Sequence, residues 1–125
     1  MRTVVGIGIA LILLSGLIHL WLVPEHFEEA TYLGGLFVAE FVGTVVAAVG
    51  IYRDQEWGWL LGALIAIGAI VAYIVHGTIG LPIVGTEELF EPMGVLTKVI
   101  ELLFLGVVVY WLVAIKSEAS GTTPE

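Results

Sequence analysis

The sequence contains no cysteine and only four lysine and arginine residues in 125 positions. The absence of thiols excludes disulfide bonds and thiolate metal ligands. So few basic residues cannot form the positive surface that neutralises phosphates, so we expect no nucleic-acid partner. A glycine-rich phosphate loop followed by Lys-Ser or Lys-Thr is also missing, so we expect no nucleotide site.

Hydrophobic side chains are abundant instead. They make up 59% of the chain, charged residues make up 13%, and the mean hydropathy is +1.08. A soluble domain of this length buries only about two-thirds of the surface that its unfolded chain exposes, so it could not hide this much apolar surface from water. The composition therefore predicts that the protein is surrounded by lipid.

Four apolar runs are long enough to cross a bilayer, which takes about 20 helical residues for ~30 Å of hydrocarbon. They cover approximately residues 4–23, 30–52, 57–79 and 94–115. The runs predict an all-α membrane protein whose residues 1–116 form an up-down bundle of four transmembrane helices. The polar residues 117–125 predict a disordered tail.

Proline and polar residues mark the expected connections. Pro24 and Pro92 are expected in the first turns of the second and fourth helices, where a missing N–H is tolerated. Residues 52–57, "YRDQEW", predict a tight turn. The longer connection "GLPIVGTEELFEP" predicts a short amphipathic helix at residues 87–91 that lies at the membrane interface.

The few basic residues predict the orientation in the membrane. Arg2, Arg53 and Lys116 precede the first span, follow the second and follow the fourth, so they lie on one side of a four-span bundle. Cytoplasmic loops retain lysine and arginine, so we expect cytoplasmic N and C termini in a multi-pass protein of the cell membrane. The acidic connections are then extracytoplasmic. Their charge either solvates that face or concentrates cations there, and the net charge of −8 is similar to that of salt-loving archaeal proteins.

Five ionisable residues lie inside the predicted spans, where such groups are costly and tend to be functional. Counting at 1.5 Å per residue places them at similar heights in the outer half of the membrane. Most also share helix faces with small residues, which predicts that they point into the bundle. The five are His19, Glu40, His76, Lys98 and Glu101.

Imidazoles and carboxylates on facing helices suit a divalent transition metal, either zinc, copper, iron or manganese. We therefore predict a metal site with His19, Glu40, His76 and Glu101 as ligands. Lys98 and Tyr73 are expected beside these ligands. Glu25, His26 and Glu29 are expected above the site, as supplementary ligands or as the residues that an incoming ion meets first.

Three other interpretations use the same residues. His19 and His76 come from the first and third spans and could ligate a haem b as a bis-histidine pair. The polar core could instead only set helix register in an accessory or assembly subunit of a larger membrane complex. A homo-oligomer is the other possible assembly. Proton or cation translocation is the third, although the inner halves of the spans are almost purely apolar.

Residues 16–41, "GLIHLWLVPEHFEEATYLGGLFVAEF", resemble a segment of small, uncharacterised four-span membrane proteins of bacteria and archaea. The resemblance depends on His19, on Pro24-Glu25-His26 and on Glu29-Ala30. It implies a four-span fold. It implies no established activity, so it assigns no catalytic residue and leaves open whether the protein is an enzyme.

Overall fold

The computed structural model describes residues 2–82, 85 and 92–119. This part of the chain forms four helices, each long and apolar enough to cross a membrane. The predicted all-α class with four helices of membrane-spanning length is therefore confirmed. The helices are α1 (Arg2–Glu29), α2 (Thr31–Tyr52), α3 (Glu56–Thr78) and α4 (Pro92–Ala119).

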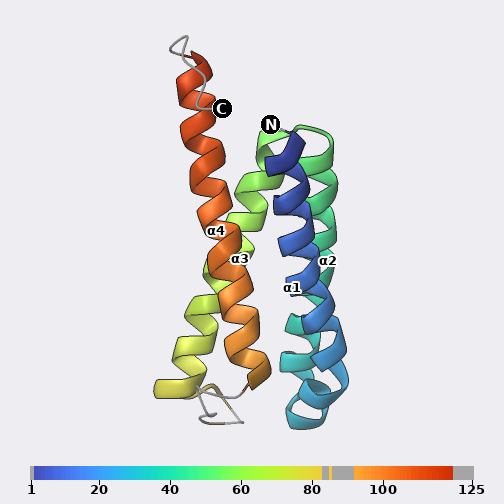
Figure 1. The fold of residues 1–125 in the computed structure, drawn as a ribbon. Helices are drawn as coiled ribbons and strands as arrows, with labels where there is room; N and C mark the ends of the chain where they lie inside the picture. Colours follow the sequence, from blue (N-terminus) through green and yellow to red (C-terminus); the bar gives the residue numbers. More distant parts are fainter. Residues whose placement is uncertain (1, 83–84, 86–91, 120–125) are drawn as a thin grey trace.

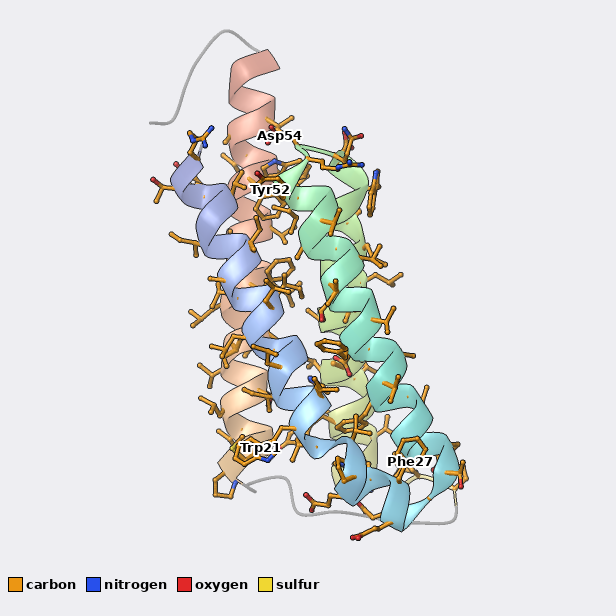
Figure 2. All side chains as sticks on the ribbon, turned by 90° about the vertical axis from the view of Figure 1, so that its right-hand side faces the viewer. Trp21, Phe27, Tyr52 and Asp54 are labelled. Carbon is orange, nitrogen blue, oxygen red and sulfur yellow. The ribbon has the colours of Figure 1, made fainter. Side chains whose placement is uncertain are left out.

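Helices that follow each other in the chain also pack against each other, and α4 closes the bundle against α1. Figure 1 shows the beginning of α1 and the end of α4 at the same end of the bundle. Figure 2 places Tyr52 and Asp54 at that end and Trp21 and Phe27 at the opposite end. We call these the Tyr52 end and the Trp21 end. Which of them faces the cytoplasm stays a prediction.

The helix that contains Pro24 differs from the prediction. Pro24 lies inside α1, which continues to Glu29, so the expectation that it begins the second helix is wrong. A proline removes one backbone donor, but membrane helices accommodate it where the surroundings satisfy the freed carbonyl. The chain turns only at Ala30, whose extended φ of −164° precedes α2. As a result, the residues from Pro24 to Glu29 belong to α1 and continue its helical faces.

The other boundaries are closer to the expectations. α4 begins at Pro92, and α4 continues to Ala119, which is three residues into the tail that was expected to be disordered. The rest of the tail, residues 120–125, and the amphipathic helix predicted at residues 87–91 lie outside the described residues.

At the Tyr52 end, α2 and α3 touch through their backbones. A Cβ atom added at Gly58 would lie 2.4 Å from the Ile51 nitrogen and 2.5 Å from the carbonyl carbon of Gly50. Glycine is therefore required at this crossing, because small residues let membrane helices approach closely. The connection between the two helices passes through Asp54, which has a φ of 57°.

Stacked aromatic rings fill the bundle core near the Tyr52 end. Trp59 stacks on Trp111 at 5.2 Å and on Phe104 at 6.3 Å between ring centroids. Buried aliphatic residues surround these rings, among them Ile12 of α1, Ala47 of α2 and Val108 of α4. This half of the bundle is a closed apolar core.

Two exposed aromatic residues lie near opposite ends of the bundle. The exposed fraction is 73% for Trp21 and 76% for Tyr52, and Figure 2 shows them at the two ends. Tryptophan and tyrosine are enriched where membrane proteins cross the lipid headgroups. Their positions fit a bundle that spans a bilayer along its long axis.

Candidate metal centre

Three helices each contribute one polar side chain to a buried group in the half of the bundle toward the Trp21 end. His19 comes from α1, Glu40 from α2 and Glu101 from α4, and one ligand atom of each lies within 4.8 Å of the others. His19 is 5% exposed and Glu101 1% exposed. We call these three residues the His/Glu/Glu group. An imidazole and two carboxylates at this spacing can hold a metal ion.

The backbone of α1 fixes the orientation of His19. Its Nδ1–H donates a hydrogen bond to the carbonyl oxygen of Ser15, one turn earlier, at 2.8 Å. The lone pair of Nε2 is then directed at Glu40 Oε2, 3.0 Å away, and at Glu101 Oε2, 3.9 Å away. Metal-ligating histidines usually have this arrangement, in which one ring nitrogen donates to a carbonyl and the other faces the ion.

Glu101 is held from two sides. The Ser15 hydroxyl donates to Oε2 at 3.2 Å, and the Lys98 ammonium contacts Oε1 at 2.5 Å. Lys98 lies one turn before Glu101 on α4, and its Nζ is 5.3 Å from the centroid of the Tyr73 ring. The carboxylate oxygen that faces His19 is thus oriented by a hydroxyl from a second helix.

The two carboxylate oxygens of Glu40 differ in their contacts with the described residues. Oε2 pairs with His19, whereas Oε1 is buried and has no hydrogen-bond partner among the described residues. Most buried polar atoms in proteins have a partner, so a buried acceptor without one needs an explanation. A bound cation or a hydrogen-bond donor of a ligand would satisfy it.

A cavity of ≈ 470 Å³ adjoins the group, and His19, Glu40, Lys98 and Tyr73 line it together with apolar residues. His76 of α3 also lines this cavity, but it is not one of the three residues whose ligand atoms converge. The structure therefore brings together three of the four predicted ligands and places the fourth on the wall beside them.

His26 repeats the arrangement of His19 two turns further along α1. It is 7% exposed, its Nδ1–H donates to the Leu22 carbonyl at 2.9 Å, and its ring stacks on Phe37 at 3.8 Å. Its Nε2 lies 3.7 Å from Glu29 Oε1. His26 also lines the cavity, so it belongs to the same space as the group without being part of it.

The acidic residues of this segment lie further out. Glu25 is exposed and does not line the cavity, and the side chain of Glu29 is 33% exposed. Neither belongs to the His/Glu/Glu group. The side chains at the end of α1 thus divide into a buried imidazole and exposed carboxylates.

Sequence reasoning missed the role of Ser15. Ser15 lies one helical turn before His19 in the sequence, and the predicted site does not include it. The structure shows that its carbonyl orients His19 and its hydroxyl orients Glu101. The only signal in the sequence is the spacing of four residues between Ser15 and His19, which is common in helices and does not identify Glu101 as the partner.

Comparison with known proteins adds no relative to this description. No protein-family model matches the chain, and no curated protein or solved structure matches it.

Proposed function

We propose that the protein is an integral membrane protein that binds a divalent transition-metal ion between His19, Glu40 and Glu101. The observation that supports this is the convergence of three donor atoms from three different helices within 4.8 Å. Two carboxylates and one lysine leave one negative charge in a buried place, which a metal cation, or a proton in its absence, would compensate.

The spacing of the donor atoms fits a metal ion. Two ligand atoms bound to tetrahedral zinc at ~2.1 Å are about 3.4 Å apart. The His19 Nε2 atom lies 3.0 Å from Glu40 Oε2 and 3.9 Å from Glu101 Oε2. Small side-chain adjustments would therefore bring all three atoms to bonding distance. Nitrogen and oxygen donors suit zinc, iron, manganese or copper.

Three protein ligands leave a fourth position open toward the cavity. Such open positions are typical of metal sites that take water or another small molecule as a ligand. His76 is our candidate for the fourth ligand when no such molecule is bound, because it lines the cavity from α3. The metal would then be bound by all four helices.

The apolar core at the Tyr52 end bears on the translocation alternative. Trp59, Phe104 and Trp111 stack across the bundle there, and Trp59 and Phe104 are at most 1% exposed. An ion leaving the His/Glu/Glu group toward that end would have to cross this packed core, which provides no ligands. The arrangement favours a site that is reached from the Trp21 end.

Elemental analysis and an absorption spectrum of the detergent-purified protein test the proposal. We expect one transition-metal ion per chain. Glu40→Gln and His19→Gln should lose the ion, and Glu25→Gln should retain it, because Glu25 is an exposed carboxylate on the same helix as His19. Circular dichroism shows whether each variant is still helical.

Each outcome of this experiment has a clear meaning. Folded wild-type protein that takes up no metal when zinc, iron, manganese and copper are supplied contradicts the proposal. A Soret band would select the haem alternative instead. Metal that persists in both ligand variants would place the ion somewhere other than the His/Glu/Glu group.

A further inference from the structure

We propose that the cavity beside the His/Glu/Glu group binds a neutral, lipid-soluble molecule with a flat, hydroxyl-bearing head, of the quinol or phenol class, which enters from the bilayer between α2 and α3. This inference depends on the walls of the cavity and on the free oxygen of Glu40. It holds for the protein without a metal ion, and for a metal ion that Glu40 binds through Oε2 alone.

The cavity exists because α2 and α3 diverge. The two helices are in backbone contact at Gly50 and Gly58, and Figure 1 shows them well separated at the opposite end. The cavity of ≈ 470 Å³ lies between them, lined by both helices together with parts of α1 and α4. Sites for small organic molecules usually measure about 300–1,000 Å³.

The residues at its edge are both apolar and exposed. Leu36 and Ala39 of α2 and Gly68 and Ala72 of α3 line the cavity and are exposed on the surface of the bundle. In a membrane this surface faces hydrocarbon, so the opening leads into lipid rather than water. A molecule that enters here must itself be soluble in lipid.

The polar residues of the cavity favour a neutral head group. Glu40 presents a buried oxygen without a hydrogen-bond partner among the described residues, and the Lys98 ammonium already contacts Glu101. A fatty-acid carboxylate would be repelled by the Glu40 carboxylate and would have to compete for Lys98. A hydroxyl group has a proton to donate to Glu40 and no charge to desolvate.

The side walls favour a flat head. The aromatic rings of Phe37 on α2 and Tyr73 on α3 line the cavity from its two sides. Most of the other lining residues of α3 are small, namely Gly68, Ala69, Ala72 and Gly77, beside Ile65 and His76. Small residues leave width for a ring, and aromatic side chains pack well against its faces.

The test is a binding titration of the full-length protein in nanodiscs with a short-chain benzoquinol kept reduced. The key variant is Gly68→Phe, which places a ring at the edge of the cavity. Gly106→Phe is the matched control, because neither glycine has an atom within 4 Å of an added Cβ and Gly106 on α4 does not line the cavity. We expect binding at least about tenfold weaker in Gly68→Phe and unchanged in Gly106→Phe.

Lauric acid and a phenol with the same chain length are titrated in parallel. We expect the quinol and the phenol to bind more tightly than the acid. Tighter binding of the acid would overturn the neutral-head assignment. Absence of quinol binding in folded protein, or binding that Gly68→Phe leaves unchanged, would overturn the site. Metal content is measured on the same samples. Failure of the metal proposal can then be told apart from failure of the quinol proposal.

Discussion

The Nε2 atom of His19 lies 3.0 Å from Oε2 of Glu40, inside the bundle and between two helices. The Nδ1–H of the same ring is already used by the Ser15 carbonyl. Two atoms that both have lone pairs are stabilised at this distance by a proton or a cation that lies between them. We expect the metal-free protein to hold a proton between these two atoms, at the place where we propose a metal ion.

Metal binding should release that proton. Because ligand atoms must give up their protons to bind a metal, we expect the release of about one proton per ion. Isothermal titration calorimetry with zinc, in two buffers of different ionisation enthalpy, measures it as a difference in apparent binding enthalpy. Equal enthalpies in both buffers would show that His19 and Glu40 do not share a proton or do not bind the ion.

Replacing Lys98 by methionine should strengthen metal binding. The ammonium contacts Glu101 and repels a nearby divalent cation, so we expect affinity to increase about tenfold in Lys98→Met. Without metal, the variant should be less stable, because Glu101 loses its partner in a buried place. Chelator competition and thermal unfolding with and without metal provide both measurements. Weaker binding in the variant would mean that Lys98 acts mainly by positioning Glu101.

Ser15→Ala should weaken the site without misorienting His19. The substitution removes the hydroxyl that donates to Glu101 and retains the carbonyl that accepts from His19. We expect a loss of about 1–2 kcal/mol in the free energy of unfolding and about tenfold weaker metal binding. Thr78→Val is the control, because that exposed hydroxyl bonds only within its own helix, to Ile74. Equal effects of the two substitutions would remove Ser15 from the site.

His19 and His26 form a matched pair of imidazoles on one helix, since both donate through Nδ1 to the carbonyl four residues earlier. Only His19 faces the two carboxylates of the group. We expect His19→Asn to abolish metal binding and His26→Asn to preserve it, as measured by elemental analysis after dialysis. Loss of metal in His26→Asn would restore the predicted role of His26 as a supplementary ligand.

The contact between α2 and α3 should depend on Gly58. An added methyl group would overlap the backbone of Gly50, so we expect Gly58→Ala to lower the free energy of unfolding by about 3 kcal/mol. Gly106→Ala should leave it unchanged or raise it by up to about 1 kcal/mol, since nothing lies within 4 Å and alanine favours helix. The free energies of unfolding of the two variants are measured in mixed detergent micelles. A tolerated Gly58→Ala would mean that the two helices separate freely.

Hydrophobic pattern alone predicted the four helices, because a span is decided locally by the length of an apolar run. Pro92 at the start of α4 followed from the same local reasoning. Pro24 did not, because a proline at the end of an apolar run is compatible with either a helix start or a helix interior. Only the packing around α1 decides between them, and the interior position aligns His26 with His19.

The sequence by itself determined which residues are too polar for lipid and at about what height they lie, since both depend on composition and on the constant rise of a helix. Tertiary structure alone decided which of them meet. Helix rotation and tilt depend on close contacts such as Gly58 on Gly50, and these bring His19, Glu40 and Glu101 together while leaving His76 on the cavity wall. The divergence of α2 and α3 beyond that contact creates the cavity, and no local sequence pattern predicts it.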